Sequence, residues 1–510
     1  MHEIITLQLG QRSNYVATHF WNAQESYFTY SENEESPVNH NIHFREGLGA
    51  DGTETFTPRT LIYDLKGGFG TLRKYNALYQ LEEEQPGLSS GLWDGTGVLQ
   101  QQPKIPQSEY QRCLDMGLPV PRLTAEMVRY WSDFNRVFYS PRSIQQLNEY
   151  DLGSQLMPFE DWSVGQSLFS ELDREHDLLD RDLRPFAEEC DQLKGMQIFS
   201  GVDDAWGGFA ASYVDRLKDE FGSKSIWTWA LNGSSQLQRE KRKLASANTA
   251  RSLSEICSQV TAYIPITDLP SKLPPHVKPD LHHAWYSSAL TSLALESVSL
   301  PSRSRGYEAL DIWAIASRDS RNIYNLQSTI GTGELTTVTT DQRHPTKGVP
   351  DSEKNGHGDD NRAQEQLKQF DIDLSPRGLA ANHDGQVFQQ ILVQRDSVAA
   401  TTSSSKASQY TGSTMNSTIG TQSFDSPLEY PVLDSFPRDL LSDQGPPGST
   451  LKVHAALSIS SQVGDYLKDL QRSVGIYVPL DQREELSNSL TTLSEAYVDG
   501  WQSDSDSGDD

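Results

Sequence analysis

Two short apolar runs organise the first half of the chain, and each leads through a polar loop into an amphipathic stretch. The first run covers residues 4–9 and stops at Gly10, and the second covers residues 195–199. The second run follows a long charged helix, predicted over 171–194, and precedes a helical pattern over 209–221. Strands that alternate with helices in this way predict an α/β fold with a doubly wound, mostly parallel sheet.

Composition separates folded stretches from low-complexity ones in the rest of the chain. Residues 334–384 are polar without period, and residues 399–448 are rich in Ser and Thr and then in Pro, which is typical of flexible segments. Apolar strands return between and after them. The expected organisation is a first domain over 1–245 with an insert at 81–170, the start of a second domain at 246–333, a disordered insert at 334–384, the rest of the second domain at 385–398 and 449–482, a flexible insert at 399–448, a C-terminal helix at 483–500 and an acidic tail at 501–510.

The charge of the chain limits the classes of partner. The 510 residues carry a formal net charge of −27, and 36% of them are hydrophobic. An acidic surface repels a nucleic-acid backbone, so we expect protein partners and no direct contact with nucleic acid. No apolar run approaches the ~20 residues of a membrane span, and we expect no cleavable leader. The three cysteines predict neither a disulfide framework nor a metal site.

The turns after the apolar runs carry the candidate chemistry. A strand that passes through glycine into a helix directs backbone N–H groups at an anion, usually a phosphate. The same turn also occurs in Rossmann-like folds that hold no ligand. The candidate nucleotide-binding residues follow three strands: Gly10, Gln11 and Asn14 the first, Asp64 and Lys66 a strand at 60–63, and Gly207 and Gly208 the run at 195–199.

The loop before the glycine pair argues against a phosphate at this turn. Asp203 and Asp204 precede the pair, and two carboxylates repel a triphosphate strongly in a site of low dielectric constant. Trp206 adds bulk where a phosphate needs space. The carboxylates suit a cation or, more simply, the N-cap of the following helix. We therefore expect Gly207→Val to damage folding more than nucleotide binding.

The opening of the chain resembles that of a tubulin. Residues 10–14 and the pair Phe20-Trp21 stand at tubulin spacing, whereas Arg12 and Ser13 replace small residues of the tubulin loop. The resemblance implies a tubulin-like fold whose nucleotide site is degenerate, because the loop after 195–199 lacks the run of glycines that wraps the phosphates in tubulins.

Three segments together resemble the Misato family of tubulin-related proteins in its fungal form. They are the tubulin-like opening, the aromatic block at 130–143, and residues 188–197 that lead to Gly207, Gly208 and Phe209. The resemblance covers residues 1–240 and, more loosely, 451–500. It implies a role in the distribution of mitochondria and the partitioning of mitochondrial DNA, and a location in the cytoplasm and at the mitochondrion, on its cytosolic face. It implies no catalytic residues.

Two hypotheses of different classes follow. In the first, the protein is a non-catalytic, tubulin-like scaffold that acts through protein partners and needs neither metal nor cofactor. In the second, it is a divergent GTPase that holds GTP with Gly10, Gln11, Asn14 and Asp64, and Lys66 supplies the charge of the absent metal. The lost phosphate glycines favour the scaffold. Nucleotide retained through purification would favour the GTPase.

Overall fold

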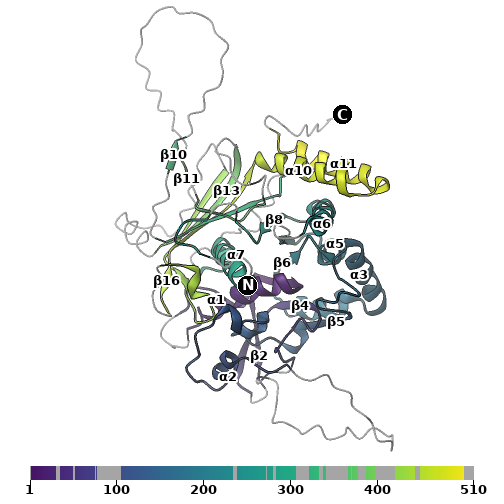
Figure 1. Ribbon diagram of the computed structural model, residues 1–510. Coiled ribbons are helices and arrows are strands. Elements are labelled where there is room, and N and C mark those ends of the chain that lie inside the picture. Colours follow the sequence, from purple (N-terminus) through teal and green to yellow (C-terminus); the bar gives the residue numbers. More distant parts are fainter. Residues whose placement is uncertain are drawn as a thin grey trace, which may run out of the picture.

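The chain forms two large sheets with helices around them (Figure 1). The computed structural model describes residues 2–29, 35–49, 52–74, 76, 78, 105–233, 238–270, 273–278, 283–305, 321–331, 337–339, 366–368, 370–376, 379, 386–396, 420–442 and 448–498. None of the helices in this part of the chain combines the length and the apolar character that a membrane span requires.

The first sheet has six strands, all parallel, in the order β5-β4-β1-β6-β7-β8. Its central strand β1 is buried along its whole length, with Leu7 opposite Leu61 on one side and Ile198 on the other. Strands buried on both faces read as continuous apolar runs, which is why the sequence reveals them. The strands are β1 (Glu3–Leu9), β4 (Thr60–Lys66), β5 (Ile144–Asp151), β6 (Leu193–Gly201), β7 (Ser225–Asn232) and β8 (Ala262–Thr267).

Helices cover both faces of the first sheet. Helices α3, α5 and α6 pack side by side on one face, whereas α1 packs against α7 on the other (Figure 1). The chain leaves β1 toward β4 and leaves β6 toward β7, so the strand order reverses between β1 and β6. In doubly wound folds such a reversal opens a crevice at the carboxyl ends of the two strands. The helices are α1 (Gln11–Glu25), α3 (Trp162–His176), α5 (Ala205–Phe221), α6 (Arg239–Cys257) and α7 (Ala284–Ser299).

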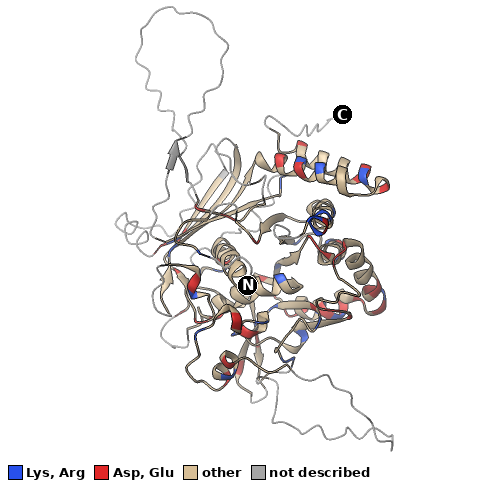
Figure 2. Ribbon diagram, in the orientation of Figure 1, with Lys and Arg blue, Asp and Glu red and all other residues tan. Residues whose placement is uncertain are grey.

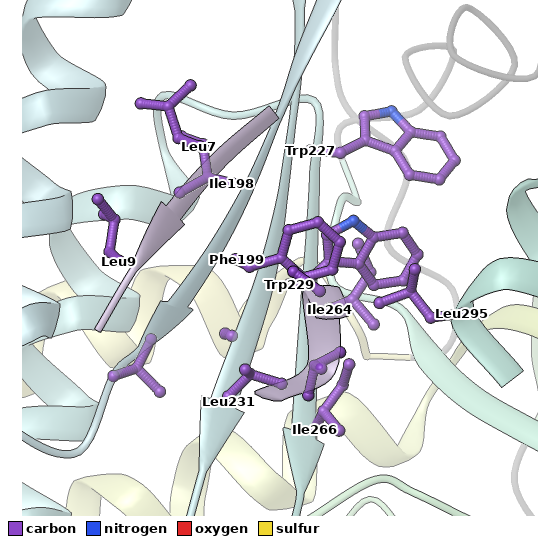
Figure 3. Close-up of a cluster of buried hydrophobic side chains, with 14 of the residues drawn as sticks. Leu7, Leu9, Ile198, Phe199, Trp227, Trp229, Leu231, Ile264, Ile266 and Leu295 are labelled. Carbon is purple, nitrogen blue, oxygen red and sulfur yellow. The ribbon is translucent and has the colours of Figure 1, made fainter. Parts of the chain in front are cut away.

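Large apolar side chains fill the space between this sheet and α7. Phe199 of β6 and Trp229 of β7 lie stacked, with ring centroids 6.3 Å apart, and Leu295 of α7 lies on the same side (Figure 3). All three side chains are fully buried. Helix α7 is buried along its length because its other side packs on the second sheet, against β17 and β13.

The second sheet has the order β12-β9-β17-β13-β14 and is antiparallel except between β13 and β14. Helices α10 and α11 form a hairpin that packs on α6. The elements here are β9 (Asn325–Ile330), β12 (Ile372–Asp373), β13 (Val387–Arg395), β14 (Gly420–Ser426), β17 (Val453–Ser460), α10 (Gln462–Tyr477) and α11 (Leu480–Glu495). The smaller elements are β2 (Phe44–Leu48), β3 (Glu54–Pro58), β10 (Thr337–Thr339), β11 (Gln366–Lys368), β15 (Tyr430–Pro431), β16 (Thr450–Leu451), α2 (Glu109–Asp115) and α4 (Arg184–Glu188).

The structure confirms the doubly wound, mostly parallel sheet and the C-terminal helix, and its strands cross several of the expected domain bounds. Strand β8 pairs with β7, so the first sheet extends beyond residue 245. Strand β5 lies inside the expected insert 81–170 yet pairs with β4, so the sheet includes the end of that range. Strands β12 and β14 likewise fall within the expected inserts 334–384 and 399–448. Residues 501–510 lie outside the described residues.

The helix predicted over 171–194 is wrong in its bounds. Helix α3 ends at His176, and Asp177 takes a left-handed conformation with φ of 46°. The chain then makes a wide turn at Leu179–Leu183 and the short helix α4. The left-handed residue breaks the helix, although the charged, periodic sequence continues through it.

Candidate functional site

A cleft of about 860 Å³ lies at the carboxyl ends of β1 and β6, where the strand order reverses. Residues of α1, of the turn before α5 and of the loop that follows β5 line it. Its polar lining includes Gln11, Arg12, Asp204 and Asp268. Ligands of doubly wound proteins bind at this position, so the cleft is the candidate site.

Four of the predicted residues cluster at the base of α1. The buried carboxylate of Asp64 accepts hydrogen bonds from Gln11 Nε2 at 2.5 Å, Asn14 Nδ2 at 2.7 Å and the backbone N–H of Leu65 at 2.8 Å. Burial raises the pKa of Asp64 to about 7, although these donors oppose the shift. Gly10 precedes the helix with φ of 84°. The four residues therefore lie close together as predicted, and their hydrogen bonds tie α1 to the end of β4.

Trp206 occupies the space above Gly10. A Cβ placed on Gly10 would lie closer than 3.0 Å to the indole nitrogen of Trp206. The indole is 6% exposed and also contacts Phe159 and Phe209, with ring centroids 5.2 and 5.6 Å away. Glycine at this turn lets another group approach the backbone closely, and here that group is the tryptophan.

Arg12 binds the loop that follows β6. Its guanidinium donates to Asp203 Oδ1 at 2.5 Å and to the carbonyl oxygen of Leu231 at 3.2 Å, and lies 3.6 Å from the carboxylate of Asp268. The second oxygen of Asp203 accepts the backbone N–H of Gly233 at 3.0 Å. Arg12 therefore joins α1 to the ends of β6 and β7. This explains why a long basic residue replaces the small one of the tubulin loop.

Asp204 caps helix α5. It accepts the backbone N–H of Trp206 at 3.0 Å through Oδ1, and its carbonyl oxygen accepts the N–H of Gly207 at 3.1 Å. The N-cap interpretation of the sequence is thus confirmed. Since the first N–H groups of a helix are those that bind an anion, Asp204 already uses two groups that a phosphate would need.

The glycine pair serves helix packing. A Cβ on Gly208 would lie closer than 3.0 Å to the carbonyl oxygen of Trp162 in α3, and one on Gly207 would meet Ser252 of α6 equally closely. Neither glycine lines the cleft. The geometry therefore does not support their predicted part in nucleotide binding. Glycine occurs at both positions because α5 packs closely on α3 and α6.

Lys66 does not join the other predicted residues. It is the last residue of β4, and its ammonium group lies 3.1 Å from the carboxylate of Asp151 at the end of β5. The lysine is absent from the cleft lining. The ion pair between Lys66 and Asp151 lies at the surface and contributes little to stability. It agrees with the interpretation of Lys66 as a surface residue at a turn.

Sequence reasoning missed Asp268 and Phe159, which both line the cleft. Asp268 follows β8 at the carboxyl edge of the sheet. Asp268 could have been found if β8 had been assigned to the first sheet, because the polar residues that follow parallel strands gather at one edge of the sheet. Phe159 lies in a loop without period and carries no sequence signal. Within the described ranges, no three His, Cys, Asp or Glu residues group as metal ligands.

Half-buried carboxylates at the cleft predict an unusual dependence of stability on pH. Burial raises the pKa of Asp204 from 3.8 to about 7 and that of Asp268 to about 6, while Arg12 opposes both shifts. Between about pH 4 and pH 7 the folded state keeps protons that the unfolded state has released, so these groups lower stability as pH rises. We expect wild type to lose about 2 kcal/mol relative to Asp204→Asn across this window.

Urea denaturation at several pH values measures this effect. Asparagine also caps helices well, so Asp204→Asn keeps the start of α5 and removes only the titrating group. Asp465→Asn, at an exposed position of α10, is the matched control and should follow the wild-type slope. Identical slopes in wild type and Asp204→Asn would contradict the prediction.

Comparison with known proteins connects this geometry to a family. The family model described as Misato Segment II tubulin-like domain matches residues 2–116, and the one described as tubulin domain matches residues 120–304. Protein DML1 of Coccidioides immitis is 55% identical over 522 residues, with 100% of both chains covered. Protein dml1 of Aspergillus niger is 50% identical and that of Aspergillus oryzae 49% identical, each with 100% of both chains covered.

Proposed function

Because the chain belongs to the Misato and DML1 family of tubulin-like proteins, we propose that it is a non-catalytic scaffold with a tubulin-like fold, which binds protein partners and does not turn over nucleotide. It acts in the distribution of mitochondria and the partitioning of mitochondrial DNA. It works in the cytoplasm and at the cytosolic face of the mitochondrion. The resemblance of the opening and of the aromatic block to the Misato family supports the mitochondrial part.

The position of Trp206 carries the non-catalytic part of the proposal. Its indole rests on Gly10, where a strand-to-helix turn would otherwise let a phosphate approach the backbone. Asp204 engages the N–H groups of Trp206 and Gly207 at the start of α5. A triphosphate would have to displace the tryptophan and neutralise the carboxylate, and both changes cost free energy.

A divergent GTPase is the second candidate, and the cleft favours it. A volume of about 860 Å³ is within the range that holds a nucleotide-sized ligand, and Gln11 and Arg12 line it. In this alternative Trp206 moves away from Gly10 when the nucleotide binds, and Arg12 leaves Asp203 to meet the phosphates.

Analysis of bound nucleotide separates the two candidates. We expect acid treatment of purified, full-length protein to release no guanine nucleotide in chromatography, and the same sample to hydrolyse GTP at the background rate. Release of one guanine nucleotide per chain would overturn the scaffold proposal. For the mitochondrial part, deletion of the coding sequence should disturb the distribution of mitochondria and mitochondrial DNA in dividing cells, as scored by fluorescence microscopy. An unchanged distribution would contradict it.

A further inference from the structure

We propose that the cleft and the adjoining loop at 152–159 form a docking surface for a segment of a partner protein that carries lysine or arginine beside aliphatic side chains. The inference rests on the proposed scaffold function and gives the chemistry of its partner. Two separate observations support it: the cleft contains more carboxylates than cations, and the adjoining loop exposes large apolar side chains.

The cleft contains more carboxylates than cations. The guanidinium of Arg12 is committed to Asp203 at 2.5 Å, and the ammonium of Lys241 to Glu160 at 2.6 Å. Asp204 has no ion pair within 4.0 Å among the described residues, and Asp268 has only the second contact of Arg12, at 3.6 Å. Two carboxylates therefore face the cleft without a full counter-charge, which favours the entry of cationic groups.

The loop that adjoins the cleft exposes large apolar side chains. The loop between β5 and α3 presents Leu152, Leu156 and Met157 with 40%, 96% and 55% of their surfaces exposed. Leu152 and Phe159 of the same loop line the cleft itself. Large aliphatic side chains that gather in one exposed loop typically mark a protein contact, because solvating them costs free energy that a partner removes. The carboxylates that attract cationic groups and the loop that exposes aliphatic side chains are thus adjacent.

Other occupants suit this surface less well. A nucleoside triphosphate and an anionic membrane both carry the wrong charge for it. The basic residues at the start of α6, visible in Figure 2, do not reverse this conclusion, because among them only Lys241 lines the cleft and Glu160 pairs with it. The net charge of −27 also attracts a basic segment over long distances and accelerates its association.

A labelled synthetic peptide that alternates lysine and leucine is the probe, and fluorescence anisotropy with the full-length protein measures its affinity. At about pH 8, above the pKa of both carboxylates, we expect Asp204→Asn combined with Asp268→Asn to weaken binding about tenfold or more, because two charges are lost. Leu156→Ser should weaken it severalfold. This side chain is 96% exposed, so its replacement leaves the fold intact. Peptides that replace lysine with glutamate, or leucine with glycine, should bind more weakly than the probe.

A matched control separates docking from general attraction to an acidic protein. Asp465→Asn combined with Leu480→Ser changes an exposed carboxylate and a leucine that is 80% exposed, both in the α10–α11 hairpin. This variant should bind the peptide as wild type does. Equal loss in both double variants, no loss in either, or no binding of the lysine–leucine peptide would overturn the docking surface. Nucleotide release would contradict the scaffold proposal instead, so the two failures are distinguishable.

Discussion

Replacing Gly208 with valine is expected to lower the free energy of unfolding by about 3 kcal/mol. Helices α3 and α5 cross at this point, and a Cβ on Gly208 would overlap the backbone carbonyl oxygen of Trp162. Gly165 of α3 makes the reciprocal approach to the carbonyl oxygen of Ala205. Backbone atoms cannot rotate away, so the two helices must separate and lose the packing between them. Urea denaturation followed by circular dichroism measures the loss.

Two further glycine variants sharpen this test. Gly475→Ala in α10 adds a Cβ that meets no atom within 4 Å, so it should stabilise the protein by up to ~1 kcal/mol through helix propensity. Gly207→Val should destabilise less than Gly208→Val, because its nearest neighbour is the side-chain oxygen of Ser252, which can move. If Gly208→Val unfolds at the wild-type urea concentration, the proposed role of glycine in this helix crossing is wrong.

The sequence revealed the parts of the fold in which one local pattern determines the structure. The run at 4–9 and the turn at Gly10 predicted β1 and the start of α1, because a strand buried on both faces is apolar throughout. Strand β5 escaped detection since it lies at the edge of the sheet, where half of its residues face solvent. The residues of β8 fell within the range 246–333 that the sequence assigned to the second domain, because the sequence of a segment does not reveal the strand with which it pairs.

The sequence predicted which residues gather at the candidate site better than it predicted what those residues contact. Gly10, Gln11, Asn14 and Asp64 do gather, as the order of the strands requires. The bulk of Trp206 in the sequence also argued against a phosphate at this loop. It did not show that the indole lies on Gly10, since that contact joins residues almost two hundred positions apart. The packing role of Gly208 depends on α3, which pattern alone does not place beside α5.

A buried ionic cluster joins α7 to the second sheet, and its loss is expected to have the second large effect on stability. Glu296 of α7 lies 2.5 Å from the guanidinium of Arg303 and forms a second, close ion pair with Arg395 of β13. The hydroxyl of Tyr27, beyond the end of α1, donates to Glu296 at 3.1 Å and accepts from Arg395 at 2.8 Å. The side chains of Glu296, Arg303 and Arg395 are fully buried. Burial raises the pKa of Glu296, but the two arginines outweigh it and hold the pKa below its usual value.

Glu296→Gln is therefore expected to lower the free energy of unfolding by about 3–5 kcal/mol, because it leaves two buried guanidinium groups without a counter-charge. Arg395→Met should cost less, since Glu296 keeps its ion pair with Arg303. Glu240→Gln removes the partner of Lys243 on the exposed start of α6 and should leave the free energy of unfolding unchanged within error, because water screens this pair. Urea denaturation of the three variants gives this order. If Glu296→Gln lowers the free energy of unfolding no more than Glu240→Gln does, the charges of the cluster do not hold α7 to the second sheet. The apolar packing of α7 against β13 and β17 then holds them together instead.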